Sequence, residues 1–268
     1  MARRPPLFYA PHRSTSGVAA ASSSGVLATA NASANTKGNY AALIAALGFS
    51  ANGFWLMPGT SNTANCDFLF DISADGGTTN IITNIPHSSG SSSHASGIYV
   101  PMRLPAGAAI SARCQATTGG AVAGMGIIPM QSGSVGIPQL NTATTYGAAT
   151  ADSGGTSIDP GAVLNTEGSL VEISAATTRP IKYLVACFGN QINSARTTAN
   201  WLVDIAIGTT VVVPDIWIRA ADTSDEITPS YFGMWVDIPA GSQLQVRAQC
   251  SITDATDRLF DVILIGFD

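Results

Sequence analysis

Few side chains in this sequence have the chemistry of an active site, and the histidines are the first of them. His12 lies near the N-terminus, whereas His87 and His94 flank a serine-rich stretch. Two histidines at this spacing could bind one metal ion, but no Cys, Asp or Glu accompanies them at ligand spacing. We interpret the stretch as a solvated loop, with a metal site as the alternative, and we predict no cofactor.

Two aspartates, Asp71 and Asp204, occupy similar apolar stretches, Phe-Leu-Phe-Asp-Ile and Trp-Leu-Val-Asp-Ile. A general acid there would need a second carboxylate or a histidine nearby, and the sequence does not reveal one. Arg113 and Arg247 recur in step with the aspartates, so a structural ion pair in each repeat is the alternative to catalysis. The sequence also lacks a GxSxG motif and a phosphate-binding glycine loop that leads into a helix. We therefore predict that the protein is not an enzyme.

The four cysteines are widely spaced and form no CxxC pair. This spacing suggests neither a disulfide scaffold nor a zinc site. We interpret them as small buried hydrophobic residues, with a disulfide crosslink as the alternative. They are Cys66, Cys114, Cys187 and Cys250.

The tryptophans could form a platform on which sugars stack, or they could lie in the core or at subunit interfaces. Trp201 lies inside an apolar run, which favours the core. Trp217 alternates with two isoleucines and therefore projects from the opposite face of its strand, where it is a candidate interface residue. Trp55 and Trp235 remain open between these roles.

Charged residues make up 11% of the chain, against roughly 25% in an average soluble domain. A surface with so few charges is typical of a protein covered by neighbours, although a monomer could share it. The net charge is −5 and no basic stripe is present, so we predict no nucleic-acid partner. No apolar run approaches the ~20 residues of a membrane span. Pro5 and Pro6 stand where a secretory signal needs an apolar helix, so we expect no secretion.

The chain contains an internal repeat. Asn-Thr-Lys-Gly at 35–38 returns as Asn-Thr-Glu-Gly at 165–168, and Leu-Pro-Ala-Gly at 104–107 returns as Ile-Pro-Ala-Gly at 238–241. The matches are collinear, with offsets that drift only from 130 to 134 residues. This order predicts two homologous units, residues 35–130 and 165–268.

Both units read as strands. The stretches 109–115 and 243–249 alternate apolar and polar residues in the period of a half-buried strand, each after a Pro-Ala-Gly turn. We therefore predict an all-β protein with two tandem homologous antiparallel β-sandwich domains of jelly-roll type. The Ala-rich segment 40–47 is the one candidate for a short helix.

Two segments lie outside the predicted units. Residues 131–164 are rich in Gly, Ser and Thr, which predicts a flexible linker or an arm that lies on a neighbour. Residues 1–34 have the same character and predict an extended N-terminal arm that serves assembly. Its candidate interface residues are Arg3, Arg4, Phe8 and Tyr9.

The segments 104–113, 201–208 and 238–247 resemble virion structural proteins of tailed bacteriophages, from the head, neck or tail gene region of phages and prophages of alphaproteobacteria. The resemblance implies a non-enzymatic protein that assembles as a homo-oligomer on the virion, as capsid decoration, neck or collar, or fibre. Its expected partners are copies of itself and other virion proteins, with a trimer as the first expectation among closed symmetric forms. A small-molecule ligand is not expected.

The alternative function is a receptor- or carbohydrate-binding module at a tail tip or on a cell surface. Exposed aromatic side chains along one edge with a carboxylate nearby would favour this module. Aromatic side chains buried in cores and between subunits would favour the structural role.

Overall fold

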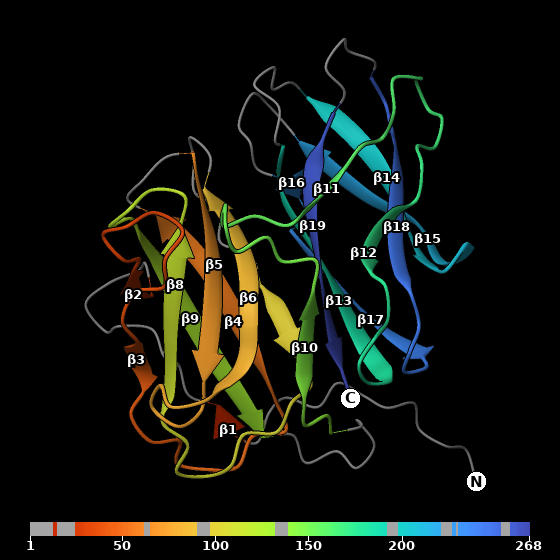
Figure 1. The fold of residues 1–268 in the computed structure, drawn as a ribbon. Coiled ribbons are helices and arrows are strands. Elements are labelled where there is room, and N and C mark those ends of the chain that lie inside the picture. Colours follow the sequence, from red (N-terminus) through yellow and green to blue (C-terminus); the bar gives the residue numbers. More distant parts are fainter. Residues whose placement is uncertain are drawn as a thin grey trace, which may run out of the picture.

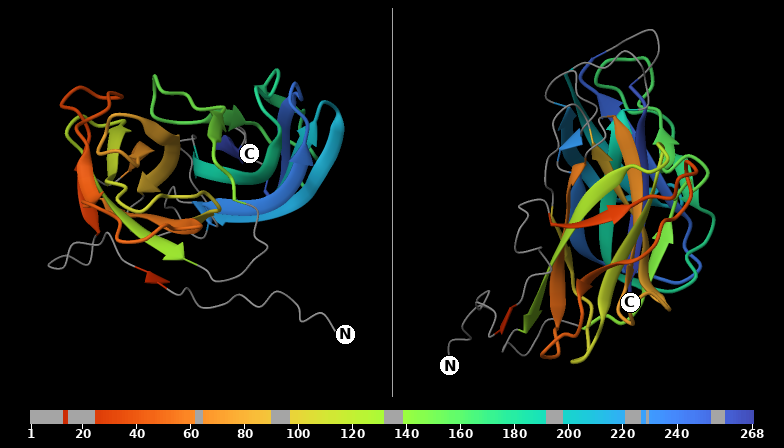
Figure 2. Two further views of the ribbon diagram at one scale, coloured as in Figure 1. Left: turned by 90° about the horizontal axis from the view of Figure 1, so that it is seen from below. Right: turned by 90° about the vertical axis from the view of Figure 1, so that its left-hand side faces the viewer.

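A computed structural model describes residues 13–14, 25–61, 65–89, 97–131, 139–191, 198–220, 227–228, 230–252 and 258–268. Every regular element within these ranges is a β-strand, and all the paired strands are antiparallel (Figure 1). Two sandwiches lie side by side: domain 1 is built from residues up to 131 and domain 2 from residues 139–268 (Figure 2). The all-β prediction is confirmed.

Domain 1 consists of two facing sheets. The first has the order β2-β9-β4-β7, with the short β1 also paired to β9, and the second has the order β3-β8-β5-β6. From β2 to β9 successive strands lie in alternate sheets, except that β5 and β6 are neighbours in the second sheet, and this wrapping is that of a jelly roll. The strands are β1 (Arg13–Ser14), β2 (Val26–Thr29), β3 (Ala41–Ile44), β4 (Gly53–Ser61), β5 (Cys66–Ser73), β6 (Asn80–Ser89), β7 (Ile98–Val100), β8 (Ile110–Ala116) and β9 (Val122–Gln131).

Domain 2 repeats this strand order. Its first sheet has the order β11-β19-β13-β17, with β10 also paired to β19, and its second has the order β12-β18-β14-β15-β16. The described strands therefore form two jelly rolls in tandem, as the internal repeat predicts. The strands are β10 (Ala143–Tyr146), β11 (Thr156–Ile158), β12 (Val171–Ser174), β13 (Ile181–Gln191), β14 (Ala199–Ile207), β15 (Thr210–Ala220), β16 (Ile227–Thr228), β17 (Tyr231–Ile238), β18 (Leu244–Cys250) and β19 (Phe260–Phe267).

The expected arm and linker both contain strands of the sandwiches. Strand β2 lies within the segment expected as an arm, and it pairs with β9 and buries Ala28 in the core. Strands β10 and β11 lie within the segment expected as a linker and pair with β19, where Ile158 is fully buried. The expectation was wrong for these residues because one inward side chain in a short strand suffices when a long neighbouring strand supplies the hydrogen bonds.

The helix considered for residues 40–47 is wrong. Ala41–Ile44 is β3, which pairs with β8 through a bulge and buries Leu43. A segment this short cannot sustain an isolated helix, so the sheet edge determines its conformation. The two Pro-Ala-Gly turns form as predicted, with Gly107 and Gly241 at φ of 84° and 81°, which favours glycine.

The two central strands of the first sheet of domain 2, β13 and β19, are buried on both faces. On β13, Leu184 and Ala186 face the core of domain 2, whereas Val185 and Cys187 pack against the core of domain 1. This double burial explains why β13 and β19 are continuous apolar runs without the alternation of a half-exposed strand. We call this contact between the two domains the seam.

Candidate functional site

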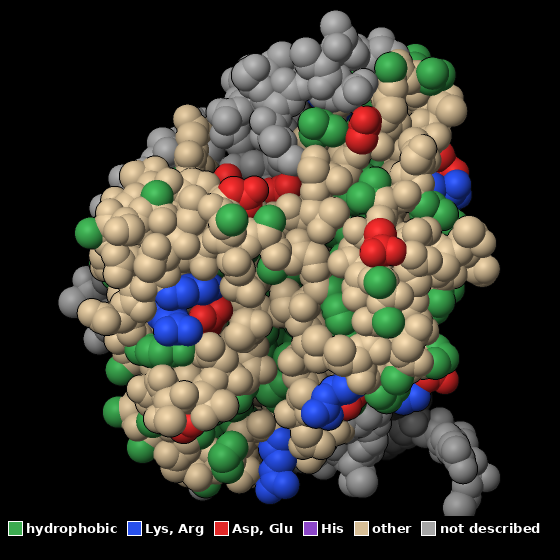
Figure 3. Space-filling model, viewed as in Figure 1, with side chains coloured by type: hydrophobic (Ala, Val, Ile, Leu, Met, Phe, Trp, Pro, Cys, Tyr) green, Lys and Arg blue, Asp and Glu red, His purple; other side chains and the backbone are tan. Residues whose placement is uncertain are grey.

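A buried ion-pair cluster lies on the outer face of β5 and β8 in domain 1. Asp71 and Arg113 are direct cross-strand neighbours, and the Arg113 Nε donates to the carboxylate at 3.0 Å. Lys37 donates from the other side, with its Nζ 2.8 Å from Oδ1 of Asp71, and also bonds the side chain of Asn84 at 3.0 Å. The Arg113 guanidinium lies 4.7 Å from the centre of the Tyr40 ring. Figure 3 shows the basic side chains around the acidic one on this face.

Domain 2 contains the equivalent cluster with a different charge. Asp204 and Arg247 are again cross-strand neighbours, with 3.0 Å between Nε and Oδ2. Glu167 replaces the lysine and pairs with the same guanidinium at 2.5 Å. Asp215 stands where domain 1 has Asn84, and each donates its backbone N–H to the central aspartate from a left-handed bulge.

The pairing of Asp71 with Arg113 and of Asp204 with Arg247, which the sequence left as an alternative, is thus observed in both domains. Each central carboxylate is 2–4% exposed and accepts several hydrogen bonds. Burial lowers the pKa of Lys37, and its contact with the Asp71 carboxylate opposes that shift. A carboxylate that is buried and held by several donors is not presented to a substrate, so the clusters fit a structural role.

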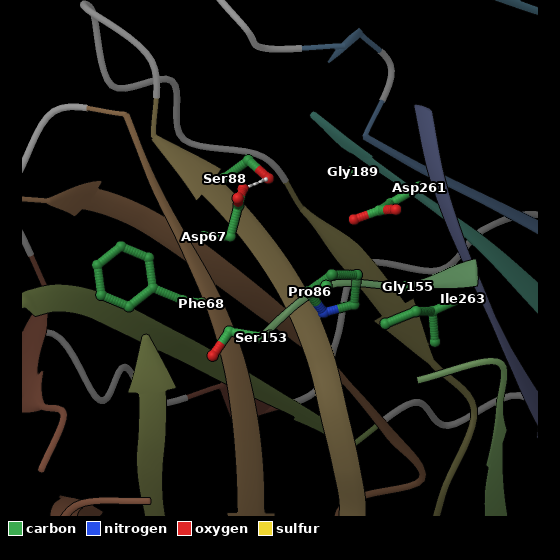
Figure 4. Close-up of a pocket in the computed structure, with 10 residues that line it drawn as sticks. Asp67, Phe68, Pro86, Ser88, Ser153, Gly155, Gly189, Asp261 and Ile263 are labelled. Atoms are coloured by element: carbon green, nitrogen blue, oxygen red, sulfur yellow. Dashed lines mark hydrogen bonds between the residues drawn. The ribbon is translucent and has the colours of Figure 1, made fainter. Parts of the chain in front are cut away.

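A small pocket opens along the seam. It is lined by Asp67 at the start of β5, by Ser88 at the end of β6, and by Asp261 at the start of β19 (Figure 4). Ser88 donates its hydroxyl to the Asp67 carboxylate at 2.7 Å. Burial, helped by the charges of Asp67 and Asp152, raises the pKa of Asp261 to about 7, although the N–H of Gly155 opposes the shift.

This pocket is too small for an organic substrate. Its cavity volume is about 10 Å³, which is the room that about one water molecule occupies. A side chain added at Gly154, Gly155 or Gly189 would meet Asp261 or its neighbour Val262 within 2.8 Å. The glycines therefore permit β13 and the residues before β11 to approach β19 closely.

Among the described residues, no three His, Cys, Asp or Glu side chains lie close enough to hold a metal ion. His87 lies on β6 and faces the core of domain 1 beside Phe68 and Phe70, and burial lowers its pKa to about 4. The loop expected for this histidine is thus a buried strand. His12 and His94 lie outside the described residues, as do Arg3, Arg4, Phe8 and Tyr9.

The four cysteines are buried free thiols, as the sequence indicates. In the described part of the chain, no helix has the length and hydropathy to span a bilayer.

The tryptophans divide between the core and the surface. Trp201 is 1% exposed and donates its indole N–H to the carbonyl of Arg258 at 3.2 Å, as a core position requires. Trp217 is 59% exposed on the outer face of β15, as its alternation predicts. Trp55 and Trp235 are 41% and 50% exposed, and with Phe232 on β17 at 41% the described surface carries four large aromatic side chains on sheet faces.

Two of these tryptophans lie in aromatic pairs. Trp55 and Tyr99 pair across β4 and β7 with 5.5 Å between ring centres. Trp235 and Tyr183 pair across β17 and β13 at 5.0 Å. On β17, Asp237 is exposed and pairs with Lys182 at 2.5 Å. Periodicity in the sequence could place Trp217 on a face, but it could not show these cross-strand partners.

No protein-family model matches this chain, and no curated protein matches it. Among solved structures it is similar to PNGF-II in two crystal forms, at 8% and 10% identity and a TM-score of 0.41 over 85% and 90% of this chain. The chain covers 59% of PNGF-II. It is also similar to the STIV MCP, a viral major capsid protein, at 13% identity and a TM-score of 0.26, over 89% of this chain and 97% of that one. Similarities this weak carry no argument about function, and the jelly-roll assignment rests on the strand order.

Proposed function

We propose that this protein is a non-enzymatic structural component of a tailed-phage virion that assembles with copies of itself and with other virion proteins. The observation that carries the proposal is the placement of Trp217 and Trp55 on the outer faces of the sheets, 59% and 41% exposed. Side chains of this size are enriched at the centres of protein interfaces. With only 11% charged residues in the chain, such faces are suited to contact with other subunits.

The proposal places the protein in the particle as capsid decoration, neck or collar, or fibre. It is tested by mass spectrometry of density-purified particles from a strain that carries the gene, together with light scattering of the purified protein. We expect the protein in the particle fraction and an oligomer in solution. A particle fraction without the protein would contradict the virion assignment, and a monomer in solution would contradict self-assembly.

A receptor- or carbohydrate-binding module is the second candidate. It is favoured by the exposed rings of Trp55 and Trp235, each supported by a neighbouring tyrosine, and by the exposed carboxylate of Asp237 on the same strand as Trp235. Sugars stack on such faces and donate hydroxyl groups to carboxylates. Binding of the protein to a glycan array, lost in Trp235→Ala, would establish this function, and no binding to any glycan would remove it.

A further inference from the structure

The seam joins two different surfaces. Domain 1 contributes the outer face of β6, where Pro86 is buried and its carbonyl accepts the hydroxyl of Tyr231. Domain 2 contributes the outer face of its first sheet, which carries Val185 and Cys187 on β13 and Ile265 on β19. The hydroxyl of Thr145 on β10 adds a hydrogen bond of 2.6 Å to β6. Because the two domains share one fold, each surface has an equivalent in the other domain.

Domain 1 carries the equivalent of the surface that domain 2 buries. The inward pair Leu56–Ile127 of β4 and β9 corresponds to the inward pair Ala186–Leu264 of β13 and β19. The neighbouring outward residues therefore correspond as well. We define the head face as the outward apolar residues Trp55, Met57, Ile128 and Met130, which correspond to Val185, Cys187, Ile265 and Phe267.

The head face is apolar and open to solvent in the single chain. Trp55 is 41% exposed, and Met57, Ile128 and Met130 are partly exposed, whereas all four equivalents in domain 2 are at most 1% exposed. Strand β9 is thus apolar on both faces, as β19 is, although its outward side chains Ile128 and Met130 stay partly exposed. Strand β1 pairs with β9 at the position where β10 pairs with β19. Ser14 is the partner of Met130, and Ala143 is the partner of the equivalent residue, Phe267.

Domain 2 carries the equivalent of β6. The bulge residue Asp215 matches Asn84, since each has a positive φ and donates its N–H to the central aspartate. Counting from that bulge, Trp217 matches Pro86 at the seam. We define the tail face as Trp217 together with Val212, which are 59% and 41% exposed.

We infer that the tail face of one copy of this chain binds the head face of a second copy, so that the contact between copies repeats the seam within the chain. This contact would bury Trp217 of one copy and Trp55 of the other. Their equivalents in the other domain, Pro86 and Val185, are already buried at the seam. Such a contact joins two different surfaces and leaves one of each free at the ends, so it continues into a ring or a filament. The inference rests on the self-assembly in the proposed function and names its surfaces.

The test uses two variants that each disable one face. Trp217→Asp removes the tail face and Trp55→Asp removes the head face; Val212→Asp and Ile128→Asp are second variants on each face. Val163→Asp is the matched control, because Val163 is 65% exposed in the loop before β12 and outside both faces. Circular dichroism and thermal melting of every variant establish that it remains folded before its mass is measured.

We expect the wild-type protein to be oligomeric by light scattering at micromolar concentration, and Val163→Asp to match it. Each face variant should raise the dissociation constant about thirtyfold or more, as loss of a buried aromatic anchor does. An equimolar mixture of Trp217→Asp and Trp55→Asp should form dimers that grow no further, since the mixture supplies one intact head face and one intact tail face.

Three results would overturn the inference. If both variants on one face stay as oligomeric as the wild type, the contact lies elsewhere, although self-assembly stands. If single variants dissociate and their mixture also stays monomeric, the contact joins identical surfaces about a two-fold axis. If the wild-type protein is monomeric, the inference fails together with the self-assembly part of the proposed function, while its presence in particles is still decided by mass spectrometry.

Discussion

The carboxyl group of Asp261 should make the stability of the seam depend on pH. Burial raises its pKa from 3.8 to about 7 in the folded protein. Between these values the folded protein holds a proton that the unfolded chain has released, so the free energy of unfolding falls as pH rises from about 4 to about 7. A shift of about three units corresponds to roughly 4 kcal/mol, as an upper bound because the group keeps some contact with water.

His87 acts in the opposite direction over the same range. Burial lowers its pKa from 6.5 to about 4, so the unfolded chain binds a proton that the folded protein excludes. Stability from this group is present above about pH 6.5 and is lost as pH falls toward 4. The pH profile of the wild-type protein therefore contains two contributions that partly cancel.

The assay isolates Asp261 by difference. Urea unfolding of the wild type and of Asp261→Asn is compared at several pH values from about 4.5 to about 8. Asparagine keeps an oxygen for the N–H of Gly155 and carries no charge, so the wild type should lose up to roughly 4 kcal/mol relative to the variant as pH rises. The control is Asp237→Asn, whose side chain is 82% exposed and should show little change with pH.

A stability difference between wild type and Asp261→Asn that does not vary with pH would refute the reasoning. It would mean that water or a counter-charge reaches the Asp261 carboxylate and that the seam is wetter than its packing indicates. A second check is Asp67→Asn, which removes a charge that raises the pKa of Asp261 and should move the transition to lower pH.

Three further predictions concern the stability of the folded domains and the burial of their side chains. Asp71→Ala should cost about 3 kcal/mol in urea unfolding, because it leaves Lys37 and a guanidinium without their buried partner; a cost no larger than the roughly 1 kcal/mol of an exposed pair would contradict this. Trp201→Ala should cost about 3–5 kcal/mol, whereas Trp217→Ala should leave the melting temperature of a dissociated chain nearly unchanged. The four thiols should react with a thiol reagent only after unfolding, since all are buried and burial raises the pKa of Cys187; rapid labelling of the native protein would disprove the assignment.

The seam gives the internal repeat a structural meaning. A tandem duplication places two copies of one fold side by side, and their contact uses a different surface of each. Each domain then keeps one surface that its equivalent buries, which here are the faces that carry Trp55 and Trp217. This asymmetry explains why a residue that is exposed in one domain, such as Trp55, has a buried apolar equivalent in the other, here Val185.

The sequence by itself determined the all-β class, the duplication and the core placement of Trp201. Strand periodicity and turn chemistry are local, so alternation in 243–249 and the Pro-Ala-Gly turns could be read without any tertiary information. The matching positions of Asp71 and Arg113 in the two repeats also raised their pairing as a possibility. The local pattern shows which face of a strand is buried only when the other face is polar, as in β18.

Only the tertiary structure decided which strands are buried on both faces and which short segments pair with them. The apolar run of β19 is compatible with a core strand of one sandwich or with a strand shared between two, and the packing of domain 1 on domain 2 selects the second. Strands β10 and β11 have too few apolar residues to be recognised alone, because their hydrogen bonds come from β19. The raised pKa of Asp261 arises in the same way, since residues far apart in the sequence exclude water from its carboxyl group.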